Sequence, residues 1–235
     1  MNRIENVFNK STQTHIALII GGDPDIETTG KLIIALAESG VDIIAIGIPF
    51  SDPVAEGATR EAAHMRALTN GCTVDKLFEM LKETKGKIGV PLLFMTYANP
   101  VFVYGKERFM ARCTECGIDG VIVPDLPFEE KDELSDACKN AGLLQIPLVA
   151  PASPERISMI TKEAEGFIYC MSPEAVGQVK AASTIPCVIG AQNTLAEADG
   201  LIIDNAIIQL ISEHGQDSVE PVKAFMDSTI VPPRL

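Results

Sequence analysis

Short apolar runs alternate along the chain with segments that have the spacing of an amphipathic helix. Eight runs have strand length and end near Gly, Pro or Asp: His15–Ile20, the run from Ile43 bounded by Gly47 and Pro49, Pro91–Thr96, Gly120–Val123, Leu144–Val149, Phe167–Met171, Pro186–Ile189 and Gly200–Ile203. Helical spacing fills most of the intervals, at Ile26–Ser39, Thr59–Thr69, Val74–Thr84, Glu107–Cys116, Glu129–Ala141, Pro154–Glu163 and Ala206–Glu213. This alternation predicts an α/β fold of the TIM (β/α)8 barrel type rather than an open doubly wound sheet. No Gly-rich dinucleotide motif follows the first run, which also disfavours the open sheet.

Two intervals near the C-terminus are shorter than the others. Ser172–Ile185 and Gly190–Asp199 separate the last three apolar runs, and each leaves room for only a turn or two of helix. We therefore expect shortened helices after strands six and seven, and barrel faces there that a second copy of the chain could cover. No composition break separates a second unit, so residues 1–235 are expected to form a single domain.

Composition and charge narrow the classes of function. The chain has 19 basic and 32 acidic residues, a net charge of −13, and no sustained stripe of Lys and Arg. This balance argues against a nucleic-acid partner or an anionic membrane surface. No apolar run follows a basic N-terminus or reaches the length of a membrane span, so the expectation is a soluble, cytoplasmic protein.

The cysteines and histidines suggest no metal or redox centre. Six cysteines show no disulfide framework, and Cys113 and Cys116, the one close pair, lie on a predicted helix without a second pair or a His cluster. Core packing is the favoured interpretation for this pair. His15, His64 and His214 form no triad pattern, and an ordinary surface or core role is favoured for each.

The loop after the second apolar run is the strongest candidate for chemistry. Asp52 and Glu56 follow a buried parallel strand at its C-terminal end, where barrel folds hold their active sites. Pro49 and Pro53 fix φ, so the loop can hold a carboxylate in place at a small entropic cost. A solvated acidic loop is the alternative that composition alone leaves open.

Four motifs in chain order resemble the alpha subunit family of tryptophan synthase. They are Gly22-Asp23-Pro24, Gly47-Ile48-Pro49-Phe50-Ser51-Asp52-Pro53-Val54-Ala55-Glu56-Gly57, Thr96-Tyr97-Ala98-Asn99-Pro100 and Val123-Pro124-Asp125-Leu126-Pro127. The resemblance covers about residues 1–172 and resumes over Ala198–Ile211. It implies a TIM barrel that cleaves indole-3-glycerol phosphate to indole and glyceraldehyde 3-phosphate, a retro-aldol step in tryptophan biosynthesis. It also implies that this chain uses no metal or cofactor.

The resemblance assigns two carboxylates to that reaction, and one of them is missing. The position of the loop carboxylate holds Glu56, and the position of the acid on strand two holds Ala45. Loss of a positioned general acid typically costs about 10²- to 10⁴-fold in rate. Asp125 or Tyr169 could substitute in part. A Glu-to-Ala change made to trap substrate would also explain Ala45, but it would not explain the changes described next.

The expected phosphate site is altered as well. The resemblance places backbone amides around the phosphate, after strand six, at a Gly-rich turn after strand seven and at a Gly-Ser pair after strand eight. Here the first loop reads Ser172-Pro173-Glu174-Ala175-Val176-Gly177-Gln178, only Gly190 remains of the second, and Asp204-Asn205 replaces the third. An N-cap of the following helix is the favoured role for Asp204. The residues predicted to bind substrate are Tyr97, Asp125, Tyr169, Gly190 and Asn205; packing of the two tyrosines and loop ordering by Asp125 stay open.

Two loops that the resemblance assigns to partner docking are retained. In the family they face the beta subunit, a pyridoxal-phosphate enzyme that receives indole through a tunnel, so that cofactor would belong to the partner. The predicted docking residues are Pro49, Ser51, Asp52, Pro53, Asn99 and Pro100. Two main hypotheses follow. One is a lyase of the family type, with weak or no activity on indole-3-glycerol phosphate or with activity on a related substrate that can lack the phosphate. The other is an inactive alpha-like paralogue, a pseudoenzyme that docks to a beta subunit and modulates it. A decayed gene product without a role is a third possibility.

Overall fold

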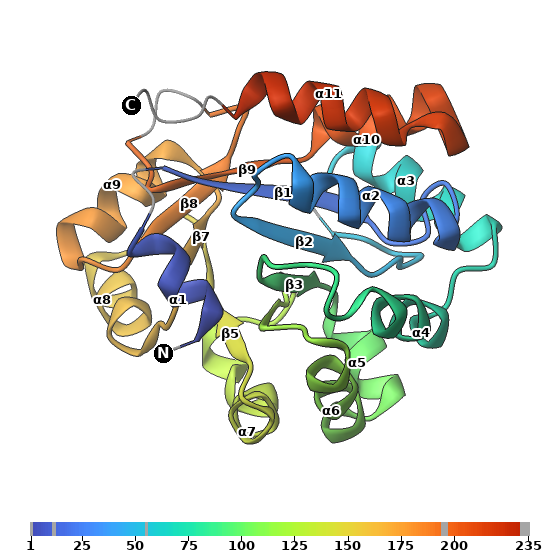
Figure 1. The fold of residues 1–235 in the computed structure, drawn as a ribbon. Coiled ribbons are helices and arrows are strands. Elements are labelled where there is room, and N and C mark those ends of the chain that lie inside the picture. The colour runs from blue at the N-terminus through green and yellow to red at the C-terminus, as the bar shows by residue number, and fades with distance from the viewer. Residues whose placement is uncertain (1, 11–12, 55, 194–196, 231–235) are drawn as a thin grey trace.

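The computed structural model describes residues 2–10, 13–54, 56–193 and 197–230, and parallel strands form its centre (Figure 1). The strands are β1 (Thr14–Ile20), β2 (Ile43–Gly47), β3 (Leu92–Met95), β4 (Gly120–Ile122), β5 (Leu144–Ile146), β6 (Leu148–Val149), β7 (Ile168–Cys170), β8 (Cys187–Gly190) and β9 (Gly200–Ile203). They pair in the order β5-β4-β3-β2-β1-β9-β8-β7-β6, and every pairing is parallel.

The ring closes through the chain itself. β5 and β6 stand at the two ends of the pairing order, yet only Pro147 separates them in sequence. Pro147 has no N–H to donate, but its carbonyl accepts a hydrogen bond from the Tyr169 amide at 3.0 Å. β5 and β6 are therefore one bent strand that pairs with β4 on one side and β7 on the other. The predicted barrel of eight parallel strands is confirmed in this form.

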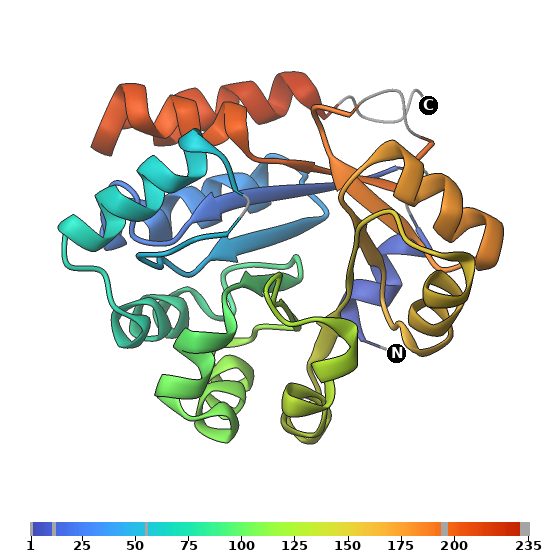
Figure 2. The same ribbon diagram turned by 180° about the vertical axis from the view of Figure 1, so that it is seen from behind.

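Helices surround the strands, and the view from behind shows α8 and α9 on the opposite side of the barrel from α4 (Figure 2). Their bounds are α1 (Arg3–Phe8), α2 (Ile26–Glu38), α3 (Ala58–Thr69), α4 (Val74–Thr84), α5 (Ala98–Tyr104), α6 (Lys106–Cys116), α7 (Asp132–Ala141), α8 (Pro154–Glu163), α9 (Pro173–Ala182), α10 (Asn205–His214) and α11 (Val219–Thr229). Short 3-10 turns at Phe128–Glu130 and Gly215–Asp217 precede α7 and α11.

The prediction of a short helix is wrong for one of the two intervals. α9 has ten residues, the same length as α7 and α8. Ser172 caps it by accepting a hydrogen bond from the Ala175 amide at 3.2 Å, and Pro173 at the first turn lets the helix begin directly after β7. Our prediction allowed too much of the interval for loops. After β8, the described residues 191–193 and 197–199 contain no helix, which fits the second expectation as far as the described chain extends.

α1 is an element that the hydrophobic pattern did not predict. Asn2 caps this six-residue helix, and Ile4 is fully buried in the apolar cluster that fills the barrel. Phe8 packs on Phe167 with ring centroids 5.4 Å apart, and Arg3 pairs with Asp119 beside the start of β4. Residues before the first strand therefore close the N-terminal end of the barrel.

Two apolar layers follow the alternation of the strands. On β2, Ile43 and Ala45 point into the barrel with residues such as Leu18 and Leu93, and Ile44 and Ile46 pack against the outer helices. All five residues of β2 are buried, as expected for a parallel strand covered on both faces. All six cysteines are buried and free, and no cluster suited to a metal occurs within the described residues. No helix there is long and apolar enough to span a membrane.

Candidate active site

A cavity of about 210 Å³ opens at the C-terminal ends of the strands, and we call it the mouth cavity. Parallel strands place their carboxyl ends together, so this is the end where barrel enzymes hold their chemistry. Four predicted site residues line it, namely Glu56, Tyr169, Gly190 and Asn205. The other lining residues are Val54, Arg60, Met95, Pro124, Leu148, Cys170, Met171, Gln192, Asn193 and Asp204.

Glu56 is held by a histidine that we expected to have only an ordinary role. Its Oε2 lies 2.6 Å from Nε2 of His64, and the two side chains are only 5% and 2% exposed. Nδ1 of His64 accepts a hydrogen bond from the Phe50 amide at 3.2 Å. In the neutral ring the proton therefore lies on Nε2, which donates it to Glu56.

The surroundings of Glu56 keep it ionised. Burial raises the pKa of this carboxyl, but hydrogen bonds from His64 and Tyr97 and the charge of Arg60 outweigh burial, so the pKa lies below its ordinary value. Burial and the neighbouring carboxylate raise the pKa of Tyr97, which stays a neutral phenol. An ionised carboxylate can accept a proton or stabilise positive charge, but it cannot act as the acid.

A buried ion pair of Arg60 and Asp204 also lines the cavity. Nε of Arg60 donates to Oδ2 of Asp204 at 2.7 Å, and Nη2 donates to the same oxygen. Arg60 and Asp204 are 7% and 4% exposed. Burial lowers the pKa of Arg60, but Asp204 and Tyr169 raise it further, so the guanidinium stays charged.

Asp204 does not have the role that its sequence position suggested. It stands at the N-cap of α10, but its side chain makes no capping hydrogen bond. Its carboxylate turns instead to Arg60, which lies 144 residues earlier in the chain. A charge-assisted bond to a buried guanidinium is stronger than a cap to a backbone amide, and it leaves neither charge unpaired.

α3 supplies the basic partner of both carboxylates. Arg60 and His64 are four residues apart, so they lie on one face of this helix, one turn after the other. Further along, Arg66 donates two hydrogen bonds to Asp23, which follows β1. The sequence signal was the i, i+4 spacing of Arg60 and His64 on a predicted helix directly after the acidic loop. It was missed because His64 was given an ordinary role and Arg60 was given none.

Ala45, the predicted position of the missing acid, lies on β2 in the barrel interior. Its side chain lies inside the barrel, in register with Leu18 on β1 and Leu93 on β3, and it is 1% exposed. Among the described residues of β2 there is no carboxylate.

Two predicted substrate-binding residues lie outside the mouth cavity. Asp125 accepts a hydrogen bond from the Ala98 amide at 2.9 Å and so orders the start of α5. The hydroxyl of Tyr97 accepts a hydrogen bond from the Val54 amide at 3.1 Å, and its ring packs on Phe50 with centroids 5.1 Å apart. Tyr97 therefore joins the loop after β2 to the start of α5.

The predicted docking residues lie on these two joined segments. Ser51, Asp52 and Asn99 are exposed, and Pro49, Pro53 and Pro100 are half-buried. Three large apolar side chains beside them are exposed: Val54 by 59%, Phe102 by 43% and Val103 by 81%. We call this surface, from Pro49 to Val54 and from Asn99 to Val103, the α5 face. Exposed apolar groups gathered in one place are typical of an interaction surface.

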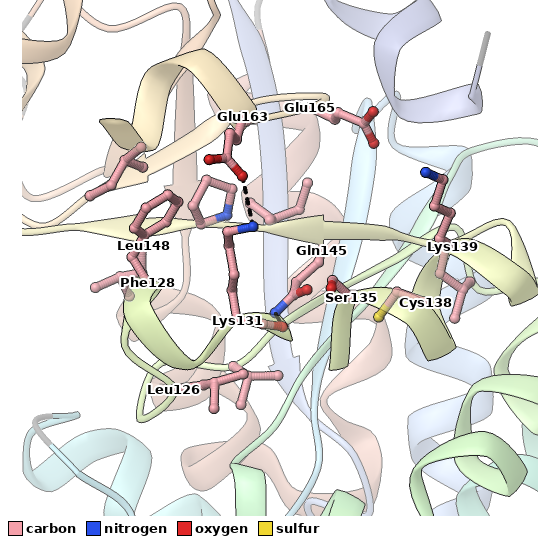
Figure 3. Close-up of a pocket in the computed structure, with 16 residues that line it drawn as sticks. Leu126, Phe128, Lys131, Ser135, Cys138, Lys139, Gln145, Leu148, Glu163 and Glu165 are labelled. Carbon is pink, nitrogen blue, oxygen red and sulfur yellow. Dashed lines mark hydrogen bonds and ion pairs between the residues drawn. The ribbon is translucent and has the colours of Figure 1, made fainter. Parts of the chain in front are cut away.

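A second cavity, of about 250 Å³, lies outside the barrel between α7 and α8 (Figure 3). Apolar residues such as Leu126, Phe128 and Leu148 form one part of its lining, and Lys131 reaches Glu163 at 2.7 Å beside them. The cavity adjoins the bend at Pro147. None of the predicted site residues lines it, so it has no part in the chemistry of the barrel mouth.

Comparisons with known proteins agree with the barrel fold. The family model described as Tryptophan synthase alpha chain matches residues 4–187. The tryptophan synthase alpha chain of Alkaliphilus metalliredigens is 38% identical over 96% of this chain and 94% of its own length. The alpha chain structure from Legionella pneumophila superposes with a TM-score of 0.88 at 33% identity, covering 97% of this chain and 95% of that one. A tryptophan synthase complex from Pyrococcus furiosus gives a TM-score of 0.86 at 28% identity, over 92% and 98% of the two chains.

Proposed function

Since the chain belongs to the tryptophan synthase alpha chain family, we propose that it keeps the partner-docking role of an alpha chain and has lost most or all of the family's lyase activity. One observation carries the docking role. Tyr97 ties the loop after β2 to α5, and the joined segments expose Val54, Phe102 and Val103 to solvent. The partner that this surface would meet is a beta subunit, since one structural relative is described as a tryptophan synthase complex.

Loss of the lyase activity rests on the chemistry of the mouth cavity. Cleavage of the indole side chain requires an acid that protonates a ring carbon, and Ala45 offers none. Glu56 is ionised, and Tyr97 holds its proton tightly because burial and Glu56 both raise its pKa. We expect cleavage of indole-3-glycerol phosphate to be slower than in a family member with both carboxylates by about 10²-fold or more.

Binding to the cognate beta subunit tests the docking role, because Val103 of the α5 face can be changed without altering the lining of the mouth cavity. Val103→Asp puts a charge on the most exposed apolar residue of this face, and we expect at least tenfold weaker binding by calorimetry. Met159→Asp is the matched control, since Met159 is 54% exposed on α8 and lies outside the face. Absence of any complex with the native chain, or equal loss in both variants, would contradict docking.

A working lyase is the second candidate, and the pair of His64 and Glu56 favours it. His64 holds the ionised carboxylate of Glu56 at the cavity, where it can accept a proton from the indole N–H or the side-chain hydroxyl of a substrate. This reading predicts indole release by the native chain that Glu56→Gln abolishes. Unchanged indole release in the Glu56→Gln variant would reject it.

A further inference from the structure

Arg60, a cationic side chain that lines the mouth cavity, is held in an ion pair with Asp204. Among the described residues that line it, Arg60 is the one cation, and two of its nitrogens donate to Asp204. Glu56 adds an ionised carboxylate without an Arg or Lys partner. Two carboxylates and one guanidinium therefore line the cavity, which gives its described lining a net negative charge.

The backbone at Gly190 is covered by a side chain of the same chain. A Cβ built on Gly190 would lie 2.8 Å from the amide nitrogen and the amide oxygen of Gln192. The Gln192 amide thus packs directly against Gly190 and narrows the space for a ligand on that side of the turn. Asn193 donates its backbone N–H to the Gly190 carbonyl at 3.0 Å, which fixes the turn beneath.

The negative charge of Asp204 disfavours anion binding at the start of α10. Asp204 precedes the first turn, and its carboxylate is 4% exposed, so water screens it little. A phosphate placed at these amides would meet that carboxylate at close range, and Arg60 could bind the phosphate only by leaving Asp204 unpaired. Both halves of the anion site are therefore occupied by the chain's own groups.

From this arrangement we infer that the mouth cavity selects small molecules without a phosphate group, neutral or cationic ones that donate hydrogen bonds, and that the pair of Arg60 and Asp204 excludes phosphate esters. The free amides of Gln192, Asn193 and Asn205 and the carboxylate of Glu56 supply polar contacts, and Val54, Met95 and Leu148 supply an apolar wall. This selectivity can be tested apart from docking, because Arg60 and Asp204 line the cavity and lie outside the α5 face, which shares only Val54 with the cavity lining.

A matched pair of probes tests the selectivity on the isolated native chain. Indole-3-propanol and its phosphate ester differ only in the charged group, and their dissociation constants are compared by NMR titration. We expect the alcohol to bind at least as tightly as the ester. Tenfold tighter binding of the ester, or no saturable binding of either probe, would overturn the inference.

Variants at the ion pair of Arg60 and Asp204 test whether the pair causes this selectivity. Asp204→Asn frees Arg60, and the ester is then expected to bind at least tenfold more tightly than it binds the native chain. Asp217→Asn removes an equal charge from an exposed turn and should leave the ratio unchanged. If Asp204→Asn does not fold, the triple change Arg60→Leu, Asp204→Gly and Asn205→Ser removes both charges and opens the helix amides. An ester affinity in the folded variant equal to that of the native chain would show that the pair does not control selectivity.

Discussion

The two walls of the barrel mouth hold a buried carboxylate in different ways. On the β2 side, the Oε2 of Glu56 is hydrogen-bonded to Nε2 of His64, and the carboxylate stays ionised with one oxygen free of His64. On the β9 side, Asp204 meets the permanent charge of Arg60, which holds it with two hydrogen bonds. The same helix, α3, supplies both partners. The difference shows that one carboxylate is available to a ligand, while the other is committed to an ion pair within the chain.

The largest effect on stability is expected from breaking the ion pair. Arg60→Leu leaves Asp204 buried without a partner, and removal of one member of a buried pair costs about 3 to 5 kcal/mol of unfolding free energy. Urea unfolding measures it. The double change Arg60→Leu with Asp204→Leu should restore much of the loss, because no charge is then left unpaired. Equal instability of the single and double variants would mean that packing, and not charge, accounts for the effect.

Ala45→Glu returns a carboxylate to the barrel and should come next in size. The new side chain enters an apolar cluster beside Leu18 and Leu93, so overpacking alone is expected to cost about 1 to 3 kcal/mol. Indole release from indole-3-glycerol phosphate should stay at the level of the native chain, since Asp204 still excludes the phosphate. Combining Ala45→Glu with the triple change at residues 60, 204 and 205 should raise it. A large gain from Ala45→Glu alone would contradict the closed phosphate site.

Replacing His64, the partner of Glu56, should lower the unfolding free energy by less than breaking the ion pair does. His64→Leu leaves Glu56 without its main hydrogen bond, and an unsatisfied buried acceptor costs about 1 to 3 kcal/mol at neutral pH.

The pH dependence of stability reports on the Glu56 carboxylate. The pKa of Glu56 is depressed in the folded state, so its stabilising contribution is present above the unfolded value of 4.5 and is lost as the pH falls through the folded pKa. Relative to the native chain, His64→Leu and Glu56→Gln should both flatten this acid limb of stability. A limb as steep in Glu56→Gln as in the native chain would assign the pH dependence to other groups.

The smallest effect concerns the link between the mouth and the α5 face. Tyr97→Phe removes the hydroxyl that accepts the Val54 amide, and loss of one such hydrogen bond costs about 1 kcal/mol. We expect binding to the beta subunit to weaken several-fold because the loop after β2 is less firmly held. Tyr104→Phe, whose hydroxyl donates to Asp75 at 2.6 Å, is a control in α5. Equal effects of the two changes on binding would show that the Tyr97 hydroxyl has no specific role in docking.

Most of the barrel could be predicted from the sequence because strand and helix periodicity is local. Each predicted strand appears within a few residues of its expected bounds, and Ala45 was correctly placed on a buried strand. α9 was underestimated because the pattern does not show that Ser172 and Pro173 start a helix without a linker. α1 was missed because it has only six residues and one fully buried side chain.

The side-chain pairs of the mouth were harder to predict. Glu56 was found because a loop after a strand is the usual place for a catalytic carboxylate. Arg60 and His64 were not, because their roles depend on which carboxylates the closed barrel brings to α3. The partner of Arg60 directly follows the last strand, 144 residues later in the chain, and helical spacing carries no information about such a long-range contact. Asp204 had a plausible local role as a cap, and a long-range contact replaced it.

The most direct test of the central claim measures both activities in one experiment. Native chain is mixed with its cognate beta subunit, and indole release from indole-3-glycerol phosphate is followed together with the rate at which the beta subunit consumes added indole. The account predicts a complex, a changed rate of indole consumption, and indole release lower by about 10²-fold or more than that of an alpha chain with both carboxylates. Indole release at the rate of such a chain, or no complex at all, would contradict it.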